Sequence, residues 1–349
     1  MSGFEFRDTF FLLPYSLFLI RYSYCSYALT FLHSYATFVL RNLMGNTDRK
    51  AYLALALVCI VWGVSWVGTK EGVRYMPPFQ MVGIRQILAG LVYVLYFMVR
   101  GAKLPRKKEW YPIIFLSVLN FMISNGLATW GVKLTTAGLS AIIGAIFPLW
   151  LVIILAFRGK NKIPPLAWFG IMVGFAGVCV VFYEHLHELF NFSFLGGIIL
   201  GLTASLAWAY GTIYTKEFAQ SFNPYHSIGW QMLISGIMLL FIANVTGQVI
   251  PFVDIKFYSW MAILFLVVVS SVIAFVAYLY ALQKLPTGLV SVYAYINPIV
   301  AVLAGSLFTG EPLTVLIITG SLVTLTGVYI VNRALKKSKA VENITSDVA

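Results

Sequence analysis

Two matching rows of tryptophan and threonine residues lie within otherwise apolar stretches of the chain. Trp62, Trp66 and Thr69 fall at i, i+4 and i+7, a spacing that places them on one face of a helix. The same spacing recurs 146 residues later, in Trp208, Thr212 and Thr215. Aromatic walls with a few polar groups are typical of small-molecule sites, whereas tryptophan also anchors helices at the lipid interface. We favour opposite walls of one cavity, because Trp62 and Trp208 lie well inside their apolar stretches.

Arg85 is the only ionisable residue deep within an apolar stretch. A charge at membrane depth is costly and by default marks a functional site. Its planar guanidinium suits a solute carboxylate. The alternative is a structural role, in which Arg85 bonds backbone carbonyls or a polar neighbour, and both interpretations stay open. All 12 acidic residues lie outside the middle of the apolar stretches, so the sequence offers no buried carboxylate relay for protons.

Other polar residues recur one helical turn apart. Asn120 and Ser124 form one such pair, Tyr293 and Asn297 form another, and Ser270 aligns with Asn120 in the second half. These side chains either line a polar cavity or hydrogen-bond between neighbouring helices.

Two prolines stand at equivalent positions inside apolar stretches, Pro148 and Pro298. Proline removes an N–H and clashes with the carbonyl four residues back, here those of Gly144 and Ala294. Unpaired carbonyls are tolerated at membrane depth only beside protein or a cavity. Each proline therefore predicts a helix kink, either beside a solute site or with a packing role alone.

The usual motifs of catalysis and metal binding are absent from the sequence, which has no HExxH, Walker loop or GxSxG. The run Glu184-His-Leu-His-Glu188 has no standard metal-ligand spacing and is typical of a solvated loop. Three cysteines, Cys25, Cys59 and Cys179, show no CxxC spacing and are interpreted as packing residues. We therefore expect neither a metal ion nor a cofactor.

Composition points to a membrane protein. Of 349 residues, 60% are hydrophobic and only 10% are charged, whereas soluble domains carry roughly 25% charged residues. The net charge of +12 comes from short basic runs between apolar segments, a distribution typical of membrane topology rather than of nucleic-acid binding. The expected surroundings are a lipid bilayer and a small-molecule solute.

The apolar stretches predict ten transmembrane helices of the length that a bilayer requires. They read 51–69, 78–99, 111–131, 137–157, 166–183, 194–214, 225–245, 259–281, 288–308 and 312–332. Residues 1–46 do not conform, and we expect Met44 to be the true initiator. The polar stretch 184–193 separates two groups of five, 50–183 and 194–334, and residues 335–349 form a tail.

The two groups of five are internal repeats. A shift of 146 residues aligns Gly83 with Gly229 and Gly90 with Gly236, and a shift of 150 aligns Gly170 with Gly320 and Gly177 with Gly327. Because five is odd, the second repeat must enter the membrane from the opposite side. The expected fold is thus an all-α integral membrane protein of ten transmembrane helices in two inverted-topology repeats, an architecture of secondary transporters.

Charge placement predicts the orientation, because basic residues favour cytoplasmic loops. If the chain enters from the cytoplasm, fourteen basic residues fall inside: Arg100, Lys103, Arg106, Lys107, Lys108, Arg158, Lys160, Lys162, Lys216, Lys284, Arg333, Lys336, Lys337 and Lys339. Four fall outside: Lys70, Arg74, Lys133 and Lys256. Both termini are therefore expected in the cytoplasm.

Several short runs resemble the drug/metabolite transporter superfamily, particularly its EamA-type exporters. They are Ile60-Val-Trp-Gly-Val-Ser-Trp66, Pro77-Pro78 with Arg85, Thr136-Ala-Gly-Leu-Ser140 with Pro148, Thr287-Gly-Leu-Val-Ser291 with Pro298, and Gly310-Glu311-Pro312. The resemblance covers about residues 50–334. One departure is Arg158-Gly-Lys-Asn-Lys162, where the family often has a Gly-Glu turn.

This resemblance implies a carrier of the inner (plasma) membrane that exports small metabolites such as amino acids. The repeats favour alternating access around a site between the two halves. Two alternatives from other classes remain, an intramembrane lipid-modifying enzyme and a non-transporting membrane partner or sensor protein. The first would need catalytic groups within the helices, and the second would not need internal repeats.

Overall fold

The computed structural model describes residues 49–158, 164–184, 190–218, 224–285, 290 and 293–348, and the regular elements in these ranges are all helical. The chain divides into two compact units, Met1–Leu53 and Ala54–Ala349. Residues 49–53, the described part of the first unit, open helix α2, and the contacts below all lie within the second unit. The predicted extension 1–46 and the run from His185 to Glu188 fall outside the described residues.

The helices of the first predicted repeat follow the expected spans closely. They are α2 (Arg49–Gly72), α3 (Pro78–Val99), α4 (Lys107–Leu116), η1 (Ser117–Asn125), α5 (Gly126–Leu134), α6 (Ala137–Gly144), α7 (Phe147–Phe157) and α8 (Pro165–Glu184). Helices α4, η1 and α5 form one continuous stretch, in which η1 is a π-helix.

The second predicted repeat has a corresponding series of helices. They are α9 (Phe192–Phe218), α10 (Pro224–Val245), η3 (Phe252–Asp254), α11 (Phe257–Phe265), η4 (Leu266–Ile273), α12 (Ala274–Lys284), α14 (Tyr293–Ala304), η5 (Gly305–Thr309) and α15 (Val315–Val348). Helices α11, η4 and α12 again form one stretch with a π-helix, η4, in its middle.

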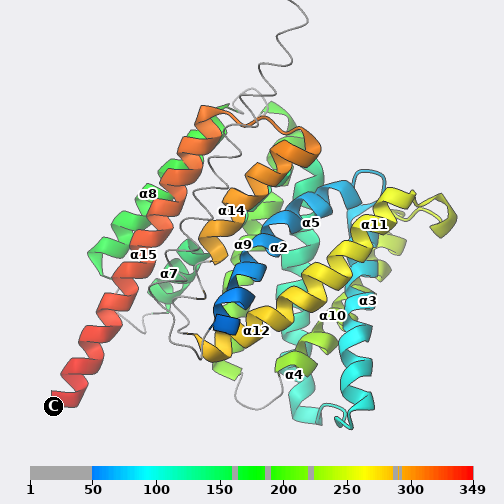
Figure 1. Cartoon of the computed structure of the whole chain (residues 1–349), viewed down its shortest axis with the longest axis horizontal. Helices are drawn as coiled ribbons and strands as arrows, with labels where there is room; N and C mark the ends of the chain where they lie inside the picture. Colours follow the sequence, from blue (N-terminus) through cyan, green and yellow to red (C-terminus); the bar gives the residue numbers. More distant parts are fainter. Residues whose placement is uncertain are drawn as a thin grey trace, which may run out of the picture. The chain divides into compact units, whose positions relative to one another are not determined.

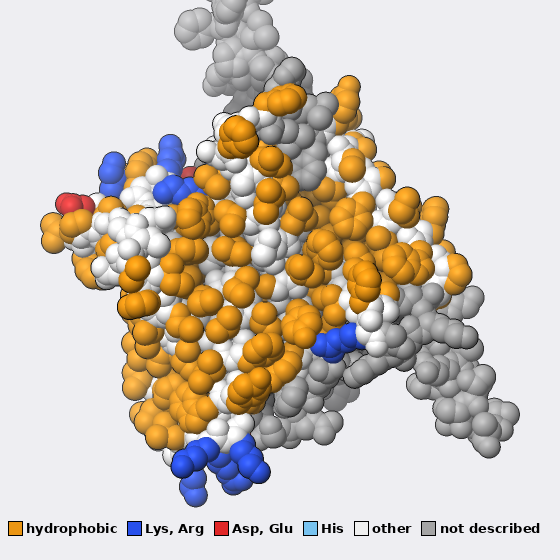
Figure 2. Space-filling model, turned by 180° about the vertical axis from the view of Figure 1, so that it is seen from behind, with side chains coloured by type: hydrophobic (Ala, Val, Ile, Leu, Met, Phe, Trp, Pro, Cys, Tyr) orange, Lys and Arg blue, Asp and Glu red, His pale blue; other side chains and the backbone are white. Residues whose placement is uncertain are grey.

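Seven helical stretches are long and apolar enough to cross a membrane: Arg49–Gly72, Pro78–Val99, Lys107–Leu134, Ala137–Ile154, Phe192–Thr215, Tyr225–Val245 and Phe257–Ala281. The fifth, ninth and tenth predicted spans coincide with shorter apolar helices, Pro165–Val181, Tyr293–Thr309 and Val315–Val331. Figure 2 shows one face covered by hydrophobic side chains, with Lys and Arg gathered at its edges. A surface this apolar suits lipid rather than water, so the described part of the chain is an all-helical membrane protein.

The two prolines have different effects on their helices. Pro298 lies inside α14, where it has no N–H to donate to the carbonyl of Ala294. Pro148 instead lies in the first turn of α7, after α6 has ended at Gly144. A proline there costs no intrahelical hydrogen bond, because the first N–H groups of a helix have no partner in any case. The predicted kink at Pro148 is therefore a break between two helices.

Helices α3 and α10 lie side by side and meet at glycines (Figure 1). A Cβ added to Gly83 would lie 3.2 Å from the carbonyl oxygen of Gly236, and one added to Gly236 would lie 2.8 Å from that of Gly83. A Cβ on Gly90 would lie 2.8 Å from the carbonyl oxygen of Gly229. Glycine thus lets the two backbones approach more closely than any side chain would permit.

Helices α8 and α15 pack in the same manner (Figure 1). A Cβ on Gly177 would lie 2.7 Å from the carbonyl oxygen of Gly320, and one on Gly320 would lie 2.8 Å from that of Gly177. Gly170 and Gly327 are related in the same reciprocal way, at 2.9 and 2.6 Å. Both helix pairs are therefore held at backbone contact distance.

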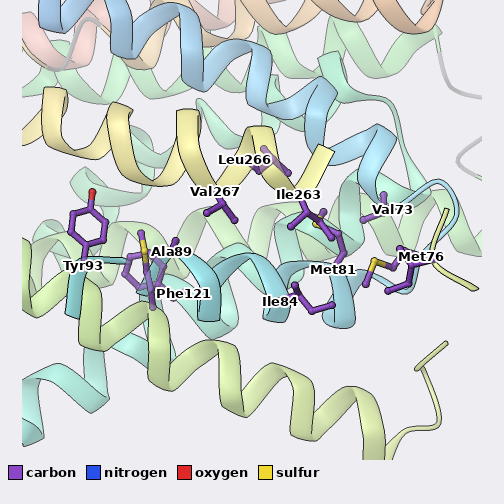
Figure 3. Close-up of a cluster of buried hydrophobic side chains, with 12 residues drawn as sticks. Val73, Met76, Met81, Ile84, Ala89, Tyr93, Phe121, Ile263, Leu266 and Val267 are labelled. Carbon is purple, nitrogen blue, oxygen red and sulfur yellow. The ribbon is translucent and has the colours of Figure 1, made fainter. Parts of the chain in front are cut away.

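A buried hydrophobic cluster fixes α3 against the end of α2 and against α11 and η4 (Figure 3). Val73, Met81, Ile263 and Leu266 are at its centre, each at most 1% exposed. Burying such side chains stabilises the packed state by about 1.5–3 kcal/mol each when the alternative is water. This cluster sets the position of α3, which carries Arg85, relative to η4.

Candidate functional site

A cavity of about 210 Å³ lies among α2, η1, α5, α6, α9 and α14, with single contributions from α3, α7, η4 and α12. Most of the residues proposed from the sequence line it: Trp62, Trp66, Thr69, Arg85, Ser124, Trp208, Ser270, Tyr293, Asn297 and Pro298. Gly144 and Ala294, four residues before the two prolines, also line it. Residues from both predicted repeats therefore meet around one space.

The row of hydroxyl groups expected on α9 does not face this cavity. Thr212 and Thr215 are exposed, and their hydroxyls donate to carbonyls of their own helix, those of Trp208 (2.7 Å) and Gly211 (2.8 Å). The cavity ends at Trp208, because η1 packs against α9 one turn further on. Of the three residues in the predicted row on α9, only Trp208 lines the cavity.

Asn120 makes the contact between η1 and α9. Its side chain lies so close to Gly211 that a Cβ there would be only 2.8 Å from the Asn120 Cγ atom. The Asn120 Oδ1 atom is buried without a hydrogen-bond partner, as is the hydroxyl of Ser117 one turn earlier. The Asn120 side chain thus lies at the contact of η1 with α9 and does not line the cavity.

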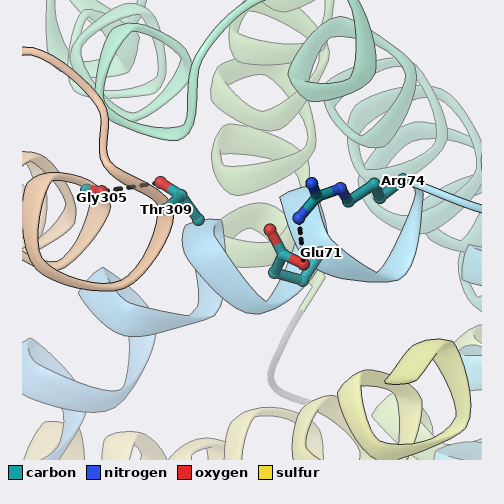
Figure 4. Close-up of polar contacts among 4 residues, drawn as sticks. All are labelled: Glu71, Arg74, Gly305 and Thr309. Carbon is teal, nitrogen blue, oxygen red and sulfur yellow. Dashed lines mark hydrogen bonds and ion pairs between the residues drawn. The ribbon is translucent and has the colours of Figure 1, made fainter. Parts of the chain in front are cut away.

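Arg85 reaches from α3 to η4. Its Nε donates to the Ser271 hydroxyl at 3.0 Å, and its Nη2 lies 3.5 Å from the Ser270 hydroxyl. A salt bridge joins Glu71 and Arg74, at 3.4 Å on the exposed end of α2 (Figure 4), and does not involve Arg85. Arg85 is therefore held by neutral hydroxyls and not by a described carboxylate.

The π-helix η4 presents three successive carbonyls to side-chain donors. Trp62 Nε1 donates to the Ser270 carbonyl at 3.2 Å. The Tyr93 hydroxyl lies 3.1 Å from the Ser271 carbonyl and 2.9 Å from that of Val272. π-Helical turns are rare and frequently occur at functional sites. Here the wider turn places Ser270 and Ser271 beside Arg85 and links η4 to α2.

Trp62 packs within a group of aromatic rings. Its ring centroid lies 5.1 Å from Phe275, 5.2 Å from Tyr278 and 5.1 Å from Tyr293, with the edge-to-face or tilted geometry that aromatic pairs prefer. Trp62, Phe275 and Tyr293 all line the cavity. Aromatic side chains therefore form part of the cavity wall.

Asn297 connects α14 to α2. With its carboxamide oriented to satisfy its surroundings, the nitrogen donates to the Cys59 carbonyl at 2.9 Å and to the Tyr293 carbonyl at 3.1 Å. Tyr293 and Asn297 are one turn apart, as the sequence predicted, and both line the cavity. Asn297 therefore has a structural role at the proline of α14 and also contributes a polar group to the cavity wall.

A role that the sequence did not indicate belongs to Glu311. Its carboxylate accepts from the backbone N–H groups of Ala137 (2.6 Å) and Gly138 (3.0 Å), at the start of α6. A carboxylate at a helix N-terminus is favoured by the unpaired N–H groups and by the helix dipole. Gly310, with φ of 72°, makes the turn that brings Glu311 there. The preceding turn is closed by Thr309, which donates to the Gly305 carbonyl at 2.7 Å (Figure 4).

Lys70 binds the other side of the turn between α5 and α6. Its Nζ donates to the carbonyls of Val132 (2.9 Å), Lys133 (3.3 Å) and Thr135, where α5 ends. The turn between α5 and α6 is therefore held by a cation at one helix end and a carboxylate at the other. The sequence analysis assigned Lys70 to an outside loop and gave neither residue a partner, because their partners are backbone groups far away in the chain.

The comparisons with known proteins agree with this architecture. The profile of the EamA-like transporter family matches residues 49–183 and 195–333. The chain is 27% identical over 298 residues to the uncharacterized transporter YvbV of Bacillus subtilis, covering 82% of this chain and 93% of that protein. It is 29% identical over 263 residues to the uncharacterized inner membrane transporter YedA of Escherichia coli strain K12, covering 75% and 83%.

One solved crystal structure is similar in fold, with a TM-score of 0.59 at 16% sequence identity. The superposition covers 82% of this chain and 98% of that chain.

Proposed function

This chain belongs to the EamA-like transporter family, and from that premise we propose that it is a secondary transporter that exports a small metabolite, such as an amino acid, by alternating access. The observation that carries the proposal is the shared cavity, which side chains from both halves of the chain line together. Its volume of about 210 Å³ leaves room for a small organic solute. Membership of a transporter family also weighs against the alternative of an intramembrane enzyme.

The glycine contacts support two inverted-topology repeats of five helices. Sequence alignment pairs Gly83 with Gly229 and Gly90 with Gly236, yet Gly83 contacts Gly236, and Gly90 contacts Gly229. Crossed, reciprocal contacts of this kind are the signature of a two-fold relation between equivalent surfaces. The α8–α15 pair follows the same rule, since Gly170 contacts Gly327. The π-helices η1 and η4 also occupy corresponding places in the two series.

A two-fold axis through these contacts explains the place of the cavity. Secondary transporters built from inverted repeats bind their solute near the bilayer midplane, where the repeats meet. Rocking of one repeat against the other then exposes the same site to each side of the membrane in turn. The proposed solute site consists of Trp62, Trp66, Thr69, Arg85, Ser124, Trp208, Ser270, Tyr293 and Asn297.

We place the protein in the bacterial inner (plasma) membrane with both termini in the cytoplasm. The relative YedA is named an inner membrane transporter, and the basic loop residues favour this orientation. A reporter that is active only in the cytoplasm, fused after the last residue, should be fully active. The same reporter fused into the short turn at Gly247, on the opposite side, should be silent. Activity at Gly247 and silence at the C-terminus would reverse the assignment.

Cysteine labelling tests the proposed solute site. Ser205 lines the cavity, whereas Thr212 is exposed two turns further along the same helix. In a background without Cys25, Cys59 and Cys179, Ser205→Cys should react with a small, neutral, water-soluble thiol reagent in membranes opened to both sides. Thr212→Cys, facing lipid, should prefer a lipid-soluble reagent. Inertness of Ser205→Cys toward the water-soluble reagent would show that solute does not reach this cavity.

A further inference from the structure

Arg85 is a half-buried cation without a described counter-charge. Its α-helix brings it to the cavity wall, where it meets two hydroxyls, Ser271 at 3.0 Å and Ser270 at 3.5 Å. A guanidinium has five N–H donors, and hydroxyl groups offset its charge only in part. A buried charge is stabilised when it is paired, and leaving it unpaired is costly.

The described residues of the rest of the cavity wall offer no negative charge. Its lining residues contain aromatic rings, small apolar side chains, hydroxyls and the carboxamides of Asn125 and Asn297, but no described Asp or Glu. Glu311 and Lys70 lie nearby in the fold, but both are bound to the ends of α5 and α6, and neither lines the cavity. The cavity therefore has one fixed positive charge in a largely apolar wall.

We propose that the transported solute is an organic anion with one net negative charge, whose carboxylate, or another planar oxyanion, binds Arg85. Its apolar or aromatic body lies against Trp62, Trp208 and Tyr293. The guanidinium fork matches a carboxylate with two parallel hydrogen bonds. The inference rests on the proposed transport function and narrows its solute class from small metabolites such as amino acids to organic acids without a free amine.

The same wall disfavours solutes with an additional positive charge. An ammonium group would need an acidic partner in the low-dielectric cavity, and the described lining holds neutral acceptors only. It would also be repelled by Arg85, because charges interact strongly where water is scarce. A carboxylate without an amine is thus preferred over the corresponding amino acid, and the corresponding amine is rejected.

Charged thiol reagents measure this selectivity without knowledge of the solute. Ser205→Cys, in the cysteine-free background, would be treated separately with a sulfonate-bearing and a trimethylammonium-bearing methanethiosulfonate of similar size. We expect the anionic reagent to react at least tenfold faster than the cationic one, after both rates are divided by those at a model thiol. Adding Arg85→Gln should reduce this ratio about tenfold, whereas Arg85→Lys, which keeps the charge, should retain most of it.

Arg74→Gln is the matched control, because Arg74 is an exposed arginine that pairs with Glu71 outside the cavity. It should leave the ratio unchanged. Binding would also be measured directly for four compounds that carry the same phenylpropyl group: an acid, the corresponding amino acid, the corresponding alcohol and the corresponding amine. Any binding should be strongest for 3-phenylpropanoate and should fall to the level of the alcohol in Arg85→Gln.

The outcomes separate the inference from the function on which it rests. Equal rates for the two reagents, or a ratio that Arg85→Gln does not change, would overturn the anion assignment and leave the cavity as a solute site. If Ser205→Cys reacts with neither charged reagent, and also fails to react with the small neutral reagent, the cavity is not a transport site. If Arg85→Gln does not fold, Arg85→Lys and the reagent ratio measured on Ser205→Cys with Arg85 in place still decide the question.

Discussion

Replacing Gly177 by leucine will prevent the chain from accumulating as a folded protein in the membrane. A Cβ at this position would lie 2.7 Å from the Gly320 carbonyl and 2.5 Å from the Thr324 hydroxyl oxygen, and it would also contact the Thr324 backbone nitrogen. Backbone atoms cannot yield as a flexible side chain does, so α8 and α15 would have to separate. Overpacking typically costs about 1–3 kcal/mol, and separation of two helices along their length would exceed that range.

Gly196→Leu provides the matched control. Gly196 is also a helical glycine, in α9, and a Cβ there would find nothing within 4 Å. The amount of monodisperse protein after detergent extraction, and its Tm, should fall sharply for Gly177→Leu and stay near the unsubstituted values for Gly196→Leu. Equal yield and Tm for the two variants would mean that α8 and α15 do not approach at these glycines.

The positions of the membrane helices could be predicted from the sequence because each helix satisfies its own backbone hydrogen bonds. Seven of the ten predicted stretches coincide with helices that are long and apolar enough to cross a membrane, and the other three coincide with shorter apolar helices. The resemblance to EamA-type transporters, first seen in short runs such as Ile60–Trp66, is confirmed by the family match over 49–183 and 195–333.

Many of the residues that line the cavity could also be predicted from the sequence, because helical spacing places residues on one face. Trp62, Trp66 and Thr69 share such a face and do line the cavity together. Beyond Trp208, the residues of the second row do not line the cavity, since residue spacing cannot indicate where a neighbouring helix closes the space. That closure depends on the contact between Asn120 and Gly211, which are far apart in the sequence.

Three further features had no usable signal in the sequence. The π-helices η1 and η4 consist of residues that are equally compatible with α-helix. The capping of α6 by Glu311 joins side chain and backbone across 174 residues. The break before Pro148 depends on where α6 ends, and a proline alone does not distinguish a kink from a new first turn.

Filling the cavity should abolish transport while preserving the fold. Ser205 is 4% exposed and its hydroxyl has no hydrogen-bond partner, so Ser205→Trp directs a large ring into a space of about 210 Å³. Thr212→Trp introduces the same ring on the exposed side of α9 and should have little effect. Extraction yield and Tm establish that both variants are folded before transport is compared.

Profiling the metabolites in the medium tests the central claim most directly. Cells without the gene would receive the unsubstituted chain, Ser205→Trp or Thr212→Trp, and the extracellular amount of each small metabolite would be compared. A transporter that uses this cavity predicts at least one solute that accumulates outside with the unsubstituted chain and with Thr212→Trp, and that falls to the level of cells without the gene with Ser205→Trp. A medium that is the same with and without the gene, or a solute that Ser205→Trp exports normally, would contradict it.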